Sequence, residues 1–232
     1  VWGVDAWVSL TAAAMCTERI RLGTMLTPLS RMRPWKLASE TATLDNLCGG
    51  RVILAVGLGA LDTGFAEFGE ATDRKTRAEM LDEGLAILTG LWAGQPFSFQ
   101  GVHYTVQPTG FMPPPPPVQR PRIPIWVVGA WGRPKSMARA LRYDGLLPHV
   151  ADLTPALVEQ MRTAADADRD PSARPYDIIV EGVTPGDDPA AAAAKVRPYA
   201  DAGATWWIES PWDYGDDHDK VLERVRAGPP TV

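Results

Sequence analysis

The sequence predicts an α/β fold in which helices cover a parallel β-sheet, and two observations lead to this prediction. Six short apolar segments have the character of strands, and a segment with helical spacing follows each one. The strand candidates are Ile20–Thr27, Val52–Gly57, Ile123–Gly129, Gly145–Pro148, Tyr176–Glu181 and Thr205–Ser210. Parallel α/β sheets carry their chemistry in the loops at the carboxyl ends of the strands, so a functional site is expected there.

The first helices and strands follow from local signals at their ends. Asp5 can cap a first helix. Pro34 suits the start of a second helix, because its missing N–H would be unpaired there. That helix continues to Leu47, and Gly49-Gly50 can end it in the left-handed conformation. Val52–Gly57 is a continuous apolar run, as expected of a strand covered on both faces.

A longer helix and a β-hairpin are expected next. Thr76–Glu79 has the capping-box pattern of a helix start, and Gly94 ends this helix. Phe97–Val106 breaks the strand–helix rhythm and predicts a short hairpin. Pro113–Pro117 has no backbone donor for a β-ladder, so it predicts an extended surface connector, with a ligand for a proline-binding domain as the alternative.

The second half of the chain repeats the strand–helix rhythm. Helices are expected over Lys135–Tyr143, after Thr154-Pro155, after Asp188-Pro189 and near Lys220–Arg226. Six strands do not close an eight-stranded barrel, which usually needs about 250 residues. Periodicity alone therefore leaves two architectures open, an open sheet or a barrel whose first two strands lie outside this chain.

Composition narrows the class of protein. The chain has 232 residues, 45% of them hydrophobic, and no linker-like shift in composition, which favours one domain. A net charge of −5 with dispersed basic residues argues against nucleic acid as a partner. No segment resembles a signal peptide or approaches the ~20 apolar residues of a membrane helix. Cys16 and Cys48 lie in apolar helical surroundings without metal-ligand spacing, which predicts buried reduced thiols, no metal site and a cytoplasmic location.

Two glycine-containing turns are candidate binding sites. Gly129-Ala130-Trp131-Gly132-Arg133 lies between a strand end and a helix start, where free amides, the helix dipole and the Arg133 guanidinium can bind phosphate. A plain strand–helix turn is the other interpretation of these residues. Gly57-Leu58-Gly59 permits close approach of a ligand to the backbone, although such pairs of glycines are common in turns.

Few side chains are candidates for catalysis. Of the three histidines only His149 follows a strand end, so it is a candidate general acid or base, with a structural role as the alternative. Glu181 and Glu209 also end strands and could face a pocket or cap the next helix. Trp131 and Trp212 lie just past strand ends and could line a pocket.

Several short motifs are spread over nearly the whole chain. They are Thr17–Thr24, Arg33–Ala38, Thr43–Leu47 with Gly49-Gly50-Arg51, Val56–Gly59, Gly101–Tyr104, Arg122–Val127 and Ala202–Glu209. No single motif is decisive, but their order and spacing resemble the bacterial luciferase-like family of flavin- or F420-dependent oxidoreductases.

The resemblance implies a fold. The family has a TIM-type (β/α)8 barrel with an insertion after the helix of the fourth strand. Residues 1–232 would then form one luciferase-like domain, with the insertion at about 95–122. Ile20–Thr27 would be the third strand, and the first two strands would lie before Val1, so the domain is expected to be incomplete at its amino end.

The resemblance also implies a cofactor site. It places a non-proline cis peptide and a bulge near Met25-Leu26, against the flavin ring, and phosphate at the turn 129–133. Luciferases proper have an arginine where this chain has Leu58, which argues against bioluminescent chemistry. The implied cofactor-binding residues are Met25, Leu26, Thr27, Gly57, Leu58, Gly59, Gly129, Ala130, Trp131, Gly132 and Arg133.

The activity implied is that of a flavin-dependent oxidoreductase or monooxygenase, acting on a small organic substrate through reduced FMN. The alternative is an F420-dependent hydride-transfer reductase or dehydrogenase, which the Ala-, Arg- and Pro-rich composition weakly favours. A non-catalytic flavin-binding protein or an incomplete barrel is a further alternative. The family implies a homodimer and a separate flavin or F420 reductase as partners, with neither nucleic acid nor membrane.

Overall fold

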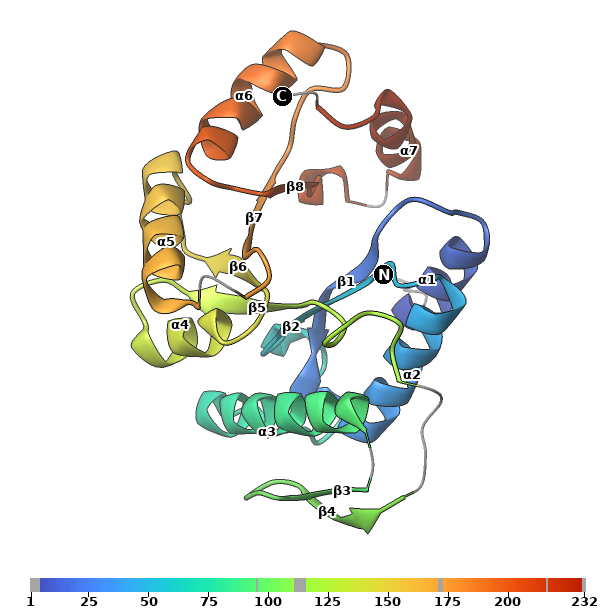
Figure 1. Cartoon of the computed structure of the whole chain (residues 1–232). Helices are drawn as coiled ribbons and strands as arrows, with labels where there is room; N and C mark the ends of the chain where they lie inside the picture. The colour runs from blue at the N-terminus through green and yellow to red at the C-terminus, as the bar shows by residue number, and fades with distance from the viewer. Residues whose placement is uncertain (1–4, 95, 111–115, 171–172, 216, 231–232) are drawn as a thin grey trace. The chain divides into compact units, whose positions relative to one another are not determined.

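The computed structural model describes all residues except 1–4, 95, 111–115, 171–172, 216 and 231–232. Six parallel strands follow one another in the order β1-β2-β5-β6-β7-β8, and two further strands, β3 and β4, form an antiparallel pair (Figure 1). The predicted α/β class with a parallel sheet is therefore confirmed. The chain divides into two compact units, Trp2–Val128 and Gly129–Val232.

The first unit contains the hairpin and the first strands of the parallel sheet. Its elements are α1 (Ala6–Met15), β1 (Leu22–Pro28), η1 (Leu29–Arg31), α2 (Pro34–Leu47), β2 (Val52–Gly57), η2 (Leu61–Thr63), α3 (Arg74–Ala93), β3 (Phe97–Gln100), β4 (Thr105–Thr109) and the start of β5 (Ile125–Ala130). Every residue of β2 is buried, as predicted for a strand covered on both faces. Leu37, Leu81 and Leu88 of the adjoining helices are also buried, so the core lies between sheet and helices.

Most helix caps agree with the sequence, and one differs. Asp5 accepts the backbone N–H of Val8 at 2.9 Å, as a capping residue does. The capping residue of α3 lies three residues before the predicted Thr76. Asp73 is the cap, because its carboxylate accepts both the backbone N–H and the hydroxyl of Thr76, at 2.7 and 2.8 Å. Thr76 therefore occupies the third position of the helix.

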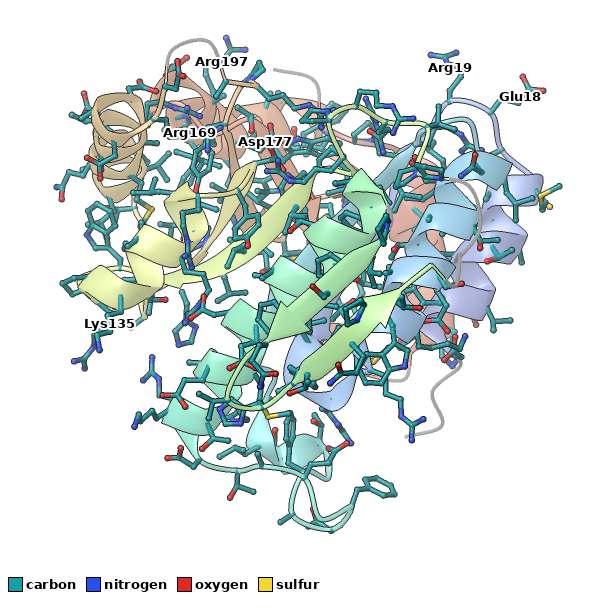
Figure 2. All side chains as sticks on the ribbon, turned by 60° about the horizontal axis from the view of Figure 1, so that its bottom comes forward. Glu18, Arg19, Lys135, Arg169, Asp177 and Arg197 are labelled. Atoms are coloured by element: carbon teal, nitrogen blue, oxygen red, sulfur yellow. The ribbon has the colours of Figure 1, made fainter. Side chains whose placement is uncertain are left out.

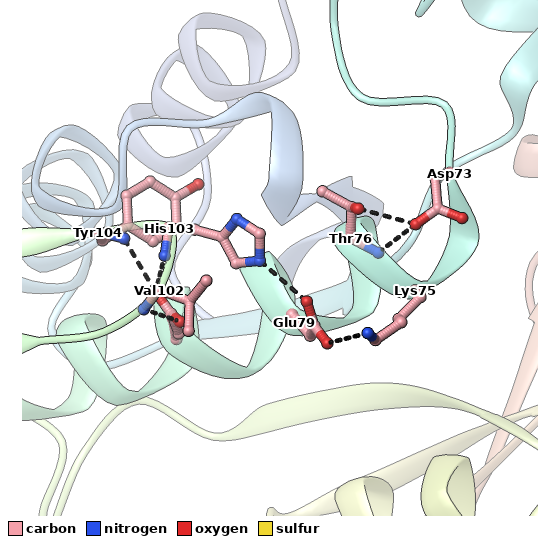
Figure 3. Close-up of polar contacts among 8 residues, drawn as sticks. Asp73, Lys75, Thr76, Glu79, Val102, His103 and Tyr104 are labelled. Atoms are coloured by element: carbon pink, nitrogen blue, oxygen red, sulfur yellow. Dashed lines mark hydrogen bonds and ion pairs between the residues drawn. The ribbon is translucent and has the colours of Figure 1, made fainter.

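The predicted hairpin forms and is attached to α3. The Glu83 carboxylate accepts three consecutive backbone N–H groups, those of Val102, His103 and Tyr104 (Figure 3). One turn earlier, Glu79 contacts His103 Nε2 at 3.1 Å. Two carboxylates on one helix face thus hold the turn of the hairpin.

The two cysteines of this unit differ in exposure. Cys48 is buried as predicted, but Cys16 is exposed, because α1 buries only Ala14 despite its apolar sequence. The expectation of buried thiols is thus wrong for Cys16.

Most of the Pro113–Pro117 run lies outside the described residues. Beyond it, Gln119 donates to the buried Asp45 through its backbone N–H and its side-chain amide, at 3.1 and 2.7 Å.

The second unit continues the alternation of strands and helices. Its elements are the end of β5, α4 (Pro134–Leu141), β6 (Gly145–His149), α5 (Pro155–Asp168), β7 (Asp177–Gly182), α6 (Pro189–Asp201), β8 (Trp206–Glu209), η3 (Trp212–Tyr214) and α7 (His218–Ala227). β7 pairs in parallel with both β6 and β8. The predicted caps Thr154 and Asp188 accept the backbone N–H groups of Leu157 and Ala191.

Candidate functional site

The end of β1 has an irregular backbone. The Met25–Leu26 peptide bond is cis, at the place that the resemblance implied. The same segment contains a bulge, since three steps along β1 from Thr24 to Thr27 face only two steps along β2. The hydroxyl groups of these two threonines are 2.7 Å apart, and Thr27 is buried.

The end of β2 packs closely against this segment. A Cβ added at Gly57 would lie 2.9 Å from Leu26 Cδ2. One at Gly59 would lie 2.7 Å from Pro28 Cβ and 3.0 Å from the Phe65 ring, and the φ of Gly59 is +77°. The structure therefore brings together the predicted residues 25–27 and 57–59, and it gives both glycines a steric reason.

Arg77, which was not predicted as a site residue, supports the loop at residues 57–59. Arg77 of α3 is only 5% exposed, and its Nη1 donates to the carbonyl oxygens of Leu58 and Gly59 at 3.0 and 3.1 Å. A signal was present, because Arg77 stands four and eight residues before Leu81 and Leu85, on the apolar face of the helix. A charged residue on that face needs a buried partner.

The predicted phosphate turn lies at the end of β5 and the start of α4. Gly132 has a φ of +76°. No atom lies within 4 Å of a Cβ added there, so open space adjoins the turn at this residue. The backbone N–H of Arg133 donates to the Ala130 carbonyl, and its side chain is exposed. Among the described residues, the N–H groups of Trp131 and Gly132 have no acceptor. These two amides and one guanidinium can receive an anion.

Gly129 has a different role from Gly132. A Cβ at Gly129 would lie 2.3 Å from Leu146 Cδ1, so its packing against β6 already requires glycine. The backbone N–H of Ala130 is bound by the Ser136 hydroxyl at 3.0 Å and is not available to a ligand. Of the five residues predicted at this turn, Trp131, Gly132 and Arg133 present free donors.

The catalytic candidate His149 is the last residue of β6, one residue beyond the predicted strand end, and it is exposed. No hydrogen bond of its side chain occurs within the ranges that the structure describes. Glu181 accepts a hydrogen bond from the Ser210 hydroxyl at 3.1 Å. Trp131 is partly exposed, and Trp212 is 77% exposed.

Glu209 belongs to a structural cluster. Its carboxylate pairs with Arg224 of α7 at 2.9 Å and accepts hydrogen bonds from Trp207 Nε1, the Thr184 backbone and the Thr184 hydroxyl. Burial raises the pKa of Glu209, but the hydrogen bonds from Thr184, Arg224 and Trp207 outweigh it and hold the pKa below its ordinary value. Glu209 therefore attaches the last helix, and it caps no helix of its own.

The predicted residues thus form two groups, one in each unit. Residues 25–27 and 57–59 gather in the first unit, and residues 129–133 form a turn in the second. No cluster of three or more His, Cys, Asp or Glu side chains suited to a metal ion occurs among the described residues. No described helix is both long and apolar enough to cross a membrane.

Comparison with known proteins adds to this geometry. Residues 1–227 match the family model described as luciferase-like monooxygenase. An F420-dependent glucose-6-phosphate dehydrogenase of Beutenbergia cavernae is 30% identical over 250 residues, which cover 93% of this chain and 71% of that protein.

Two solved structures share the fold. The coenzyme F420-dependent tetrahydromethanopterin reductase of Methanopyrus kandleri has a TM-score of 0.73 at 18% identity, covering 96% of this chain and 86% of that one. The monooxygenase RslO1 of Streptomyces bottropensis has a TM-score of 0.65 at 24% identity, covering 96% of this chain and 61% of that one. This chain therefore spans less than two thirds of the Streptomyces enzyme.

Proposed function

We propose a function from the family to which this chain belongs, the luciferase-like monooxygenase family. The chain is an oxidoreductase that transfers a hydride between coenzyme F420 and a small organic substrate. The observation that carries the proposal is the turn at residues 131–133, with its unpaired amides and exposed guanidinium. F420 is favoured because the Beutenbergia relative is named as F420-dependent. Leu58 also lacks the cationic side chain that luciferases proper have at this position.

The residues present fit a phosphate-bearing flavin or deazaflavin. Gly132 leaves open space above the turn, and a ligand phosphate can reach the two unpaired N–H groups there. In the first unit, Gly57 and Gly59 let the end of β2 pack directly against Leu26 and Pro28, beside the segment that would border the ring. F420, when bound, supplies the hydride chemistry of its deazaflavin ring.

The chain itself contributes binding and orientation. The Arg133 guanidinium and the amides of Trp131 and Gly132 would hold the cofactor phosphate. Met25, Leu26 and Thr27 would border the ring, with Thr27 kept in place by its contact with Thr24. His149, exposed at a strand end, is the proposed proton donor or acceptor for the substrate.

The direct test is a titration of the purified chain with oxidised F420 and, separately, with FMN, followed by the fluorescence of each cofactor. Micromolar binding of F420 and much weaker binding of FMN is expected. Arg133→Gln should weaken F420 binding about tenfold, since a charge-assisted hydrogen bond is lost. Lys135→Gln is the matched control, because this exposed side chain points away from the ribbon at the start of α4 (Figure 2). Binding of neither cofactor would contradict the proposal.

The second candidate is an FMN-dependent monooxygenase supplied with reduced FMN by a separate reductase. The family description and the Streptomyces neighbour favour it. Tight binding of FMN with no binding of F420, together with consumption of oxygen when reduced FMN and substrate are present, would select this candidate instead.

The role of His149 needs its own variant. His149→Ala should lower kcat by about a hundredfold if the imidazole moves a proton, and it should leave cofactor affinity unchanged. An unchanged kcat across the pH range would assign His149 no catalytic role.

A further inference from the structure

The side chain of Arg77 carries a buried positive charge without a buried negative partner. It is 5% exposed, and within the described part of the chain no carboxylate pairs with it. Its guanidinium contacts the Phe65 ring at 5.2 Å from the centroid, and its Nε is buried without a hydrogen-bond partner there. Buried charges are normally paired or hydrogen-bonded, so the partners of this one are informative.

Among the described residues, the hydrogen-bond partners of the Arg77 guanidinium are two consecutive carbonyl oxygens, those of Leu58 and Gly59. Both of the following peptide bonds are trans, and in a trans peptide the C=O and N–H groups point in opposite directions. Turning these carbonyl oxygens toward Arg77 therefore turns the N–H groups of Gly59 and Ala60 away from it. Neither N–H has an acceptor among the described residues.

Close packing of Pro28 and Phe65 around Gly59 also restricts the conformation of the loop. Gly59 has a φ of +77°, and Pro28 and Phe65 would lie within 3.0 Å of an added Cβ. Successive N–H groups around a left-handed residue form a concave site that favours anions. The charge of Arg77 behind the same two peptides adds a favourable potential for a negative group.

We propose that Arg77 is a positioning residue that orients the N–H groups of Gly59 and Ala60 to bind the phosphate of the cofactor. The inference rests on the proposed function, since it assigns a further contact to the same cofactor. It also gives a physical substitute for the missing arginine at position 58. The backbone supplies the donors here, and a buried arginine supplies the charge from α3.

The test compares each cofactor with the same ring lacking its phosphate, F420 with its phosphate-free deazaflavin and FMN with riboflavin. In Arg77→Gln the Kd of the phosphate-bearing form should rise about tenfold, or ~1.4 kcal/mol, while that of the phosphate-free ring stays within about twofold. Arg77→Lys should fall between, because it keeps the charge without the fork. Arg74→Gln, an exposed position on the same helix, is the control.

Equal weakening of both forms in Arg77→Gln would show a merely structural role and overturn the inference, and so would no weakening. A second measurement does not depend on the cofactor or on the folding of a variant. In the wild-type chain, inorganic phosphate should shift the amide NMR signals of Gly59 and Ala60 saturably. Absence of these shifts overturns the inference, whereas failure of F420 and FMN to bind while the shifts persist overturns only the proposed function.

Discussion

The Glu83 carboxylate of α3 accepts the backbone N–H of Val102 at 2.7 Å, and the next two amides of the hairpin turn converge on the same group. One side chain therefore satisfies three backbone donors of a segment 19 to 21 residues away. The hairpin breaks the strand–helix rhythm of the sequence, and this carboxylate determines where its turn lies on the first unit.

Glu83→Gln should release the hairpin turn. Burial raises the pKa of Glu83, but the three backbone amides outweigh it, so the pKa lies below its ordinary value of 4.5. The charge thus stabilises the docked hairpin above about pH 4.5, and the contribution is lost as the pH falls through the folded-state pKa. At pH 6 the variant should lose about 1–2 kcal/mol of local stability, discounted for partial exposure.

Hydrogen exchange of the Val102, His103 and Tyr104 amides measures this effect. Their protection should fall in the wild type as the pH drops below about 4.5, and it should be low throughout in Glu83→Gln. Glu67→Gln removes an exposed carboxylate of the same unit and should change nothing. Equal protection in the wild type and Glu83→Gln would show that the carboxylate does not hold the turn.

Gly59→Ala should destabilise the first unit more than Gly49→Ala does. Both positions have a positive φ, so both variants strain the backbone by about 1 kcal/mol. Only Gly59 would also place its Cβ 2.7 Å from the rigid Pro28, whereas nothing lies within 4 Å at Gly49. Urea unfolding should show an additional loss of about 1–3 kcal/mol for Gly59→Ala. Similar losses in the two variants would contradict the crowding at Gly59.

Arg224→Met should detach α7. Arg224 is 8% exposed, and its loss leaves the Glu209 carboxylate without its cation. The free energy of unfolding should fall by about 2–3 kcal/mol, after allowance for the partial exposure of Glu209. The Glu209→Gln, Arg224→Met double variant should be less destabilised than the sum of the single variants, as measured by urea unfolding. Lys220→Ala breaks an exposed pair with Asp217 and should cost less than about 0.5 kcal/mol. Strict additivity would mean that Glu209 and Arg224 are not coupled.

The two cysteines should react differently. Cys16 is exposed and Cys48 is buried, so an aromatic disulfide reagent should modify one thiol in the native chain and a second only in urea. Cys16→Ser should abolish the native reaction. Two reactive thiols in the native chain would contradict the burial of Cys48.

The sequence predicted most elements within one or two residues, because their signals are local. Apolar runs mark the strands, and Pro34, Thr154 and Asp188 mark helix starts through chemistry that involves only a few neighbouring residues. The start of α3 was misplaced because Asp73 and Thr76 are both good capping residues and lie in one turn. The cis peptide at Met25–Leu26 was expected only from the family resemblance, since no residue type signals it.

The candidate site was predicted in part. The turns at 57–59 and 129–133 could be found, because they follow apolar strands and contain glycines. Their separate roles could not be found. Gly129 is required by the contact of its backbone with Leu146, whereas Gly132 is required by its own positive φ. Glycine in a sequence gives no sign of which reason applies.

The sequence by itself determined the order of strands and helices, the parallel sheet and the family, because these depend on periodicity, caps and motif order along the chain. Only the tertiary structure decided which charges are buried and what they contact. Arg77 meets the carbonyl oxygen of Leu58 across 19 residues, Arg224 meets Thr184 across 40, and Asp45 meets Gln119 across 74. The free energy of a buried charge depends on partners that folding brings near, and distance along the chain does not reveal them.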